Sequence, residues 1–175
     1  SGIANIPNLR PQIRAFFDFT KGAVPVQVAP YDDYGHGTHI AGLIASSGAQ
    51  TRGQFAGLAP NVQLIGLKVL DANGNGSTSH LLNALEFAGT NKAKLHIDVI
   101  NLSLGHPIYE PAANDPLVRA VEKAVEAGIV VVVSAGNSGY DPTTGQPAYA
   151  SIESPGNAPS VITVGATKTF ATIGR

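Results

Sequence analysis

The residues best suited to chemistry lie in a glycine-rich stretch that carries two histidines. His36 and His39 stand three residues apart, and Gly35 and Gly37 flank the first of them. Glycines leave little bulk around an imidazole, and a histidine at the mouth of a helix suits general acid or base work near neutral pH. The residue types and their spacing make His36 the leading candidate for a catalytic group.

The same stretch allows a second interpretation, a metal site. Asp32 and Asp33 lie just upstream, so two carboxylates and two imidazoles are available as ligands. Zinc signatures on helices, however, place a glutamate between or beside the histidines, and this stretch has none. His39 lies one helical turn further on among apolar residues, where we expect it to be partly buried and structural. These features favour acid–base chemistry at His36 over metal binding.

The composition of the chain bears on its partners. Its 175 residues are 43% hydrophobic and 13% charged, which is typical of a compact globular domain. A net charge of −1 provides no basic field for nucleic acid and no polybasic segment for a membrane surface. No apolar run approaches the roughly 18 residues that span a bilayer. The sequence therefore predicts neither nucleic acid nor membrane as a partner, and the absence of cysteine leaves the redox compartment open.

Strand-like and helix-like segments alternate along the chain. We expect strands at 15–19, 62–70, 97–105, 129–133 and 160–166, and helices at 38–46, 80–90 and 116–127. This alternation predicts βαβ units, an α/β fold with a largely parallel sheet and helices packed against it. In such sheets functional residues collect at the carboxyl ends of the strands.

Glycine-rich segments follow three of the expected strands. One of them, Gly74-Asn75-Gly76, lies between a strand and a helix, as a nucleotide-binding loop would. A dinucleotide fingerprint requires a third glycine where Ser79 stands, and no lysine follows as in a phosphate-binding loop. A nucleotide-binding α/β domain is therefore only a secondary alternative.

The segment Gly35–Gly42 resembles the histidine box of the subtilisin-like serine proteases, the subtilases. Asn101–Gly105 and Ser134–Gly139 also match segments of that family in order and spacing. The resemblance implies a mainly parallel, doubly wound sheet with helices on both faces, incomplete at both ends. It also implies a serine endopeptidase that acts on polypeptides without a cofactor.

The resemblance assigns roles to individual residues. It implies that His36 is the general base and that the side-chain amide of Asn137 donates to the oxyanion. It implies that an extended substrate pairs through its backbone with Ser103, Leu104 and Gly105. Ala135 and Gly136 would form the wall of the pocket for the residue before the cut. The opposite side of the substrate would pair with Gly74, Asn75 and Gly76.

Two elements of the family's catalytic triad have no counterpart in the sequence. The family takes its aspartate from a segment that would end just before Ser1, and its nucleophile from a Gly-Thr-Ser segment that does not occur here. We interpret the local aspartates as solvated loop or strand-end residues: Asp18, Asp32, Asp33 and Asp71. We therefore expect residues 1–175 to be part of a peptidase domain, inactive alone, with the remaining segments of that domain as a possible partner.

Further expectations follow from the family. Residues 46–57 lack the carboxylate-rich oxygen ligands of the calcium loop found in many secreted subtilases, so calcium stays possible in the parent protein but has no clear site here. The resemblance also implies a secreted or extracytoplasmic protein. The main rival function is a catalytically dead subtilase-like domain that binds peptides or serves as a structural module.

Overall fold

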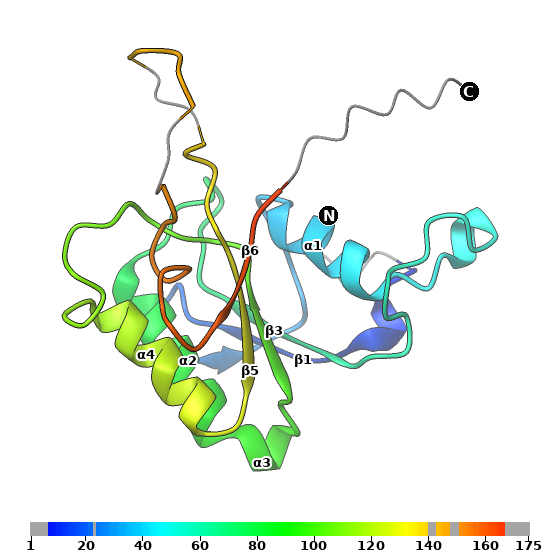
Figure 1. Ribbon diagram of the computed structural model, residues 1–175. Coiled ribbons are helices and arrows are strands. Elements are labelled where there is room, and N and C mark those ends of the chain that lie inside the picture. The colour runs from blue at the N-terminus through cyan, green and yellow to red at the C-terminus, as the bar shows by residue number, and fades with distance from the viewer. Residues whose placement is uncertain (1–6, 23, 140–142, 148–150, 167–175) are drawn as a thin grey trace. The chain divides into compact units, whose positions relative to one another are not determined.

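The computed structural model describes residues 7–22, 24–139, 143–147 and 151–166 (Figure 1). The chain divides into two compact units, residues 1–87 (unit 1) and residues 88–175 (unit 2), and each is described by itself. Ser1-Gly2-Ile3, next to which the family's aspartate segment is expected, lie outside the described ranges.

Unit 1 is built on a three-stranded sheet. Its strands are β1 (Ile13–Asp18), β2 (Val26–Gln27) and β3 (Leu64–Lys68), in the order β2-β1-β3. β1 is parallel to β3 and antiparallel to β2. The helices of this unit are α1 (His36–Ala45) and the first part of α2 (Thr78–Thr90), which crosses the boundary between the units.

Two neighbouring phenylalanines show how the helices cover this sheet. Phe16 belongs to a buried cluster with Leu9 and with Ala45 of α1. Phe17 contacts Phe87 of α2, with ring centroids 4.7 Å apart. Successive side chains of a strand point to opposite faces. α1 and α2 therefore cover opposite faces of the sheet, as expected of a doubly wound fold.

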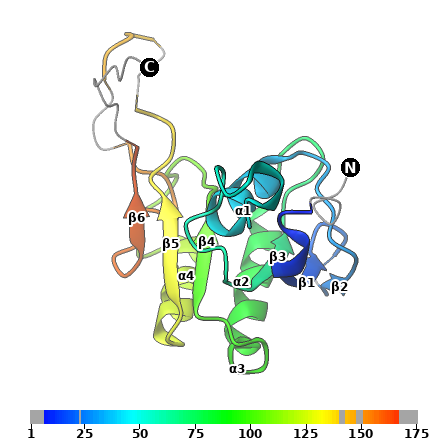
Figure 2. The ribbon, with the colours of Figure 1, turned by 90° about the vertical axis from the view of Figure 1, so that its right-hand side faces the viewer.

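Unit 2 contains a fully parallel sheet. Its strands, in the order β4-β5-β6, are β4 (Val99–Leu102), β5 (Val130–Ser134) and β6 (Ile162–Val164). The short helix α3 (Lys92–Leu95) precedes the sheet, and α4 (Pro116–Glu126) packs against β5. Because all three strands run the same way, their carboxyl ends lie at one edge (Figure 2).

The boundaries of α4 follow from local chemistry. Asp115 is its N-cap and accepts hydrogen bonds from the backbone N–H groups of Leu117 and Val118 at 2.8 and 3.4 Å. Pro116 follows at the first helical position, where a missing N–H is harmless. Gly128, at φ +80°, lies just after the helix in a conformation that favours glycine.

Replacing this cap should destabilise the protein measurably. We expect Asp115→Ala to lower the free energy of unfolding of the full-length protein by about 1–2 kcal/mol, because two backbone donors lose their acceptor. The matched control is Asp98→Ala, a change of an exposed aspartate in the same unit, for which about 0.5 kcal/mol or less is expected. Denaturant unfolding of both variants, with proteolytic activity blocked, checks the prediction. Equal effects would contradict it.

The predicted fold class is confirmed, and most predicted elements occur within a few residues of their expected positions. α1 begins at His36 rather than at 38, and β4 is shorter than predicted. Ser77 lies just before α2, and its Oγ accepts a hydrogen bond from the N–H of His80 at 3.2 Å. β2 and α3 were not predicted. Each helix in the described part of the chain is too short or too polar to cross a lipid bilayer.

Candidate functional site

His36 is the first residue of α1 and follows a turn that only glycine forms easily. Gly35, the N-cap, has φ +105°, in the left-handed region. His36 is exposed, as the reaction proposed for it requires. His39 is exposed as well, so the expectation that it would be partly buried is wrong. The apolar contacts of α1 are made instead by its other face, through Ala41, Ile44 and Ala45.

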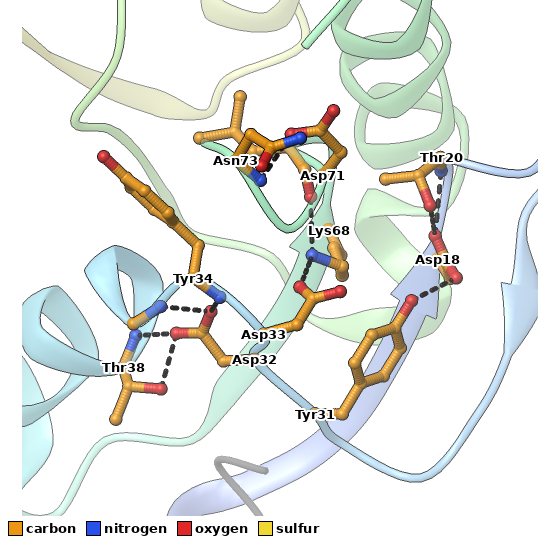
Figure 3. Close-up of polar contacts among 12 residues, drawn as sticks. Asp18, Thr20, Tyr31, Asp32, Asp33, Tyr34, Thr38, Lys68, Asp71 and Asn73 are labelled. Atoms are coloured by element: carbon orange, nitrogen blue, oxygen red, sulfur yellow. Dashed lines mark hydrogen bonds and ion pairs between the residues drawn. The ribbon is translucent and has the colours of Figure 1, made fainter. Parts of the chain in front are cut away.

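Asp32 organises the turn before His36 (Figure 3). One carboxylate oxygen accepts from the N–H groups of Tyr34 and Gly35, and the other from the N–H and hydroxyl of Thr38, at 2.6 to 3.1 Å. Burial alone would raise the pKa of Asp32, but these hydrogen bonds outweigh it and lower the pKa to about 2. The carboxylate therefore acts as a cap for the first turn of α1.

A second aspartate, Asp18 at the end of β1, is buried, with only 1% of its surface exposed. It accepts hydrogen bonds from the Tyr31 hydroxyl at 2.6 Å and from the N–H and hydroxyl of Thr20. Burial would raise the pKa of Asp18, but these bonds hold it below its usual value. Burial and the hydrogen bond to Asp18 raise the pKa of Tyr31 to about 12. The interpretation of Asp18 as an ordinary solvated aspartate is wrong, because its carboxylate is buried and fixes local backbone.

Lys68 ties the segment before His36 to the end of β3. Its ammonium pairs with Asp33 at 2.6 Å and lies 5.1 Å from the centre of the Tyr31 ring (Figure 3). The same ammonium donates to the carbonyl of Leu70. These contacts hold the loop that carries Tyr31 and Asp33 against the strand end.

The cap at Asp32 predicts an acid-sensitive start of α1. A pKa lowered on folding stabilises the folded state above the unfolded value of 3.8, and this contribution disappears as pH falls through the folded value of about 2. We expect Asp32→Asn to cost about 1–2 kcal/mol at pH 7, an amount reduced by solvent screening of the half-buried carboxylate. At pH 2, where about half of the folded-state carboxylates are protonated, only a small part of this cost should remain. Unfolding measured at both pH values checks this, with Asp98→Asn as the exposed control. An Asp32→Asn effect as large at pH 2 as at pH 7 would contradict it.

The predicted substrate loop Gly74–Gly76 is a tight turn after β3. The Asp71 carboxylate accepts from the N–H groups of Asn73 and Asn75 at 2.8 and 2.9 Å, and these bonds lower the pKa of Asp71. Gly74 has φ +78°, and a methyl group there would lie 2.5 Å from the Tyr34 ring. Because a carboxylate already occupies two of the turn's amides, the site is unsuited to a phosphate, which argues against nucleotide binding here.

In unit 2 the structure brings two predicted substrate segments together. Leu102 of β4 pairs in register with Val133 of β5, so Ser103–Gly105 and Ala135–Asn137 leave the same edge of the sheet side by side (Figure 2). The Ser134 hydroxyl donates to the carbonyl of Leu104 at 3.5 Å. Asn137 is exposed at this edge. This arrangement presents backbone groups and one side-chain amide on adjacent loops.

A residue that the sequence analysis did not consider also lies here. The N–H of Glu153 donates to the carbonyl of Ala135 at 3.0 Å, and the Ser138 hydroxyl donates to its Oε1 at 2.8 Å. Ser154, the next residue, pairs with His106 through two backbone hydrogen bonds of 3.0 Å. Glu153 is thereby held between the two predicted substrate segments. A glutamate in a chain with few charges was the available signal, but its sequence position did not reveal this placement.

The acidic and histidine side chains of the described residues do not gather into a metal site. Among these residues, no group of three or more His, Cys, Asp or Glu side chains lies close enough to hold an ion. The carboxylates of Asp32 and Asp33, considered above as ligands, are engaged with Thr38 and Lys68 instead.

Comparison with known proteins identifies the family. The model of the subtilase family (Peptidase_S8) matches residues 1–173. The chain is 44% identical to serine protease AprX of Bacillus subtilis (strain 168) over 139 residues, 77% of this chain and 30% of that protein. It is 42% identical to subtilisin DY of Bacillus licheniformis over 103 residues, 59% of this chain and 34% of that protein.

A solved structure supports the same conclusion. The fold matches sphericase with a TM-score of 0.77 and 30% identity, over 93% of this chain and 49% of that protein. The chain thus spans about half of sphericase and about a third of the two curated relatives. With the histidine box at the start of α1 and the two glycine-rich loops at one edge of a parallel sheet, the chain belongs to the subtilase family.

Proposed function

We propose that this chain forms part of a serine endopeptidase that hydrolyses peptide bonds through an acyl-enzyme. The observation that supports this most is the exposed position of His36 at the first residue of α1, within the family's histidine box. Neither the Gly-Thr-Ser segment nor the aspartate segment of the family occurs in residues 1–175. In this proposal other segments of the same polypeptide supply both groups.

The reaction assigns one task to each group. His36 accepts the proton of the serine hydroxyl as its oxygen attacks the substrate carbonyl carbon, and the carbonyl π electrons move to oxygen. Asn137 donates its side-chain N–H to this oxyanion. His36 then gives its proton to the leaving amine as the C–N bond breaks. The aspartate orients the imidazole throughout. A water molecule then attacks the acyl-enzyme, again with His36 as the base, and hydrolysis releases the serine.

The substrate in this proposal is an extended polypeptide. The proposal assigns Ser103–Gly105 and Gly74–Gly76 to pairing with the substrate backbone, and Ala135 and Gly136 to the pocket for the residue before the cut. In this proposal the chemistry requires no cofactor, and the protein acts outside the cytoplasm. Calcium remains compatible with this proposal for the parent protein, although residues 46–57 offer no clear site for it.

Activity-based labelling tests the proposal. The full-length protein is treated with a fluorophosphonate, which labels activated serines, and is assayed with a mixed peptide substrate at neutral pH. We expect labelling of one serine outside residues 1–175 and loss of peptide cleavage in parallel. The isolated 175-residue chain should show neither labelling nor cleavage.

Other results would reject parts of the proposal. Labelling of a serine within residues 1–175 would overturn the assignment of the nucleophile to another segment. Peptide binding by the full-length protein without labelling or cleavage would favour the rival function, a catalytically dead peptide-binding domain.

A further inference from the structure

We propose that Lys68 is a positioning residue for the cleavage reaction, because it couples the turn that carries Gly74–Gly76 to the segment that leads into His36. The inference rests on the proposed function above, in which His36 is the base, and it adds a residue that acts on this base through other residues. All the groups involved belong to unit 1.

The backbone of Lys68 is a fixed point in the sheet. Lys68 is the last residue of β3 and pairs in register with Asp18 of β1. Its carbonyl accepts a hydrogen bond from the N–H of Phe19 at 2.9 Å. Only 9% of its side chain is exposed. The ammonium is therefore held at the carboxyl end of the strand, where it can anchor less regular segments.

The ammonium contacts two different loops. On one side it pairs with Asp33 at 2.6 Å and lies 5.1 Å from the centre of the Tyr31 ring, in the segment that leads into His36 (Figure 3). On the other side it donates to the carbonyl of Leu70, where the turn after β3 begins. An ammonium has three donors, and a charge with so little access to water requires such partners. One largely buried charge thus joins the two loops.

The turn that begins at Leu70 moves as a unit, because it is closed by its own hydrogen bonds. Leu70 and Gly76 form an isolated antiparallel bridge, and the N–H of Asp71 donates to the carbonyl of Asn75 at 2.7 Å. A displacement of Gly74–Gly76 therefore also displaces the carbonyl that Lys68 binds.

A second contact joins the same two loops. A methyl group on Gly74 would lie 2.5 Å from the Tyr34 ring, so this ring lies directly against the turn, two residues before His36. When an extended peptide pairs with Gly74–Gly76, it orders the turn, and Lys68 transmits this order to the segment before the base. Binding energy from a part of the substrate that does not react is thereby used to orient the reacting groups.

Two substrates of different length test the inference in the full-length protein. One is an acylated single residue with a p-nitroanilide leaving group, which has no further residues to pair with Gly74–Gly76. The other carries additional residues before the same one and is long enough to pair there. In the wild-type protein we expect the longer substrate to have the higher kcat. Lys68→Met, which keeps an unbranched side chain and removes the charge, should lower this kcat by about 10- to 100-fold and the kcat of the short substrate by about threefold or less.

Two further variants complete the experiment. Asp33→Asn removes the charge partner of Lys68 at a position where 42% of the side chain is exposed, so it keeps the inference testable if Lys68→Met does not fold. It should lower the kcat of the longer substrate by about two- to fivefold. The matched control is Lys123→Met, at an exposed position of α4, which should change both kcat values by about twofold or less.

The ratio of the two kcat values decides the outcome in an active protein. A ratio that Lys68→Met and Asp33→Asn leave unchanged, even if both kcat values fall, would overturn the inference, because Lys68 would then only stabilise the fold. Equal kcat values for the two substrates in the wild-type protein would overturn it as well, since pairing with the turn would have no effect on the base.

If the wild-type protein cleaves neither substrate, the proposed function fails separately, and the coupling is tested without catalysis. The NMR signals of the His36 ring are then followed as the longer peptide is added. A change in these signals that occurs in the wild-type protein and is lost in Lys68→Met would support the coupling. The same change in both proteins, or no change in either, would reject it.

Discussion

Replacing His36 with alanine should abolish peptide cleavage by the full-length protein. We expect kcat to fall about 10⁶-fold, a magnitude known for the corresponding base of a subtilisin and transferred to this chain. The reason is that a serine hydroxyl is a weak nucleophile unless a base removes its proton during attack. Labelling by a fluorophosphonate should be lost together with cleavage, since both depend on the activated serine.

His39→Ala is the matched control, because both histidines are exposed and both lie in the first turns of α1. A loss that came only from weakening this helix would affect the two variants alike. We expect His39→Ala to keep far more activity than His36→Ala, with kcat measured under substrate saturation. Equal inactivation of both variants, or a fully active His36→Ala, would contradict the assignment of the base.

The elements that could be predicted from the sequence are those whose signals are local. Asp115 and Pro116 mark the start of α4, and Gly128 marks its end, because capping and backbone conformation depend on a few neighbouring residues. The run of valines that forms β5 is likewise explained by its central position between β4 and β6. The family assignment also came from short motifs, which the comparisons then confirmed.

The elements that could not be predicted depend on residues far away in the sequence. β2 has two exposed residues, Val26 and Gln27, and exists because they pair with Phe17 and Asp18 of β1. α3 has four residues and no side-chain cap, so nothing in its sequence distinguishes it from a loop. In both cases tertiary contacts decide the conformation.

The candidate site also contains some features that depend on local sequence and others that depend on distant contacts. The glycine turns at Gly35 and Gly74 follow from residue type, since both need positive φ. The role of Asp32 arises because its carboxylate reaches forward to Thr38, six residues later. Glu153 lies 48 residues after Gly105 in sequence and reaches its place only through the pairing of Ser154 with His106. No local pattern predicts a contact of that kind.

Removing the side-chain amide of Asn137 should slow the chemical step without weakening substrate binding. We expect Asn137→Leu to lower kcat by about 10²–10³-fold, a magnitude known for the oxyanion donor of a subtilisin and transferred to this chain. The amide is a donor to negative charge that exists only in the transition state and the tetrahedral intermediate, so KM should stay nearly constant. Steady-state kinetics of the full-length protein, with kcat and KM determined separately, give the answer.

The control for Asn137→Leu is Asn114→Leu, an equal change at an exposed position before α4, where no loss of kcat is expected. The separate effects of Asn137→Leu on kcat and on KM decide which role the amide has. If Asn137→Leu raised KM and left kcat unchanged, the amide would be a ground-state contact to the substrate. If both variants lost activity equally, the cause would be the added apolar surface. Only a loss confined to kcat at Asn137 identifies a group that interacts with the developing oxyanion. Such a result would place the oxyanion at the sheet edge where β5 ends and where the two predicted substrate segments lie side by side.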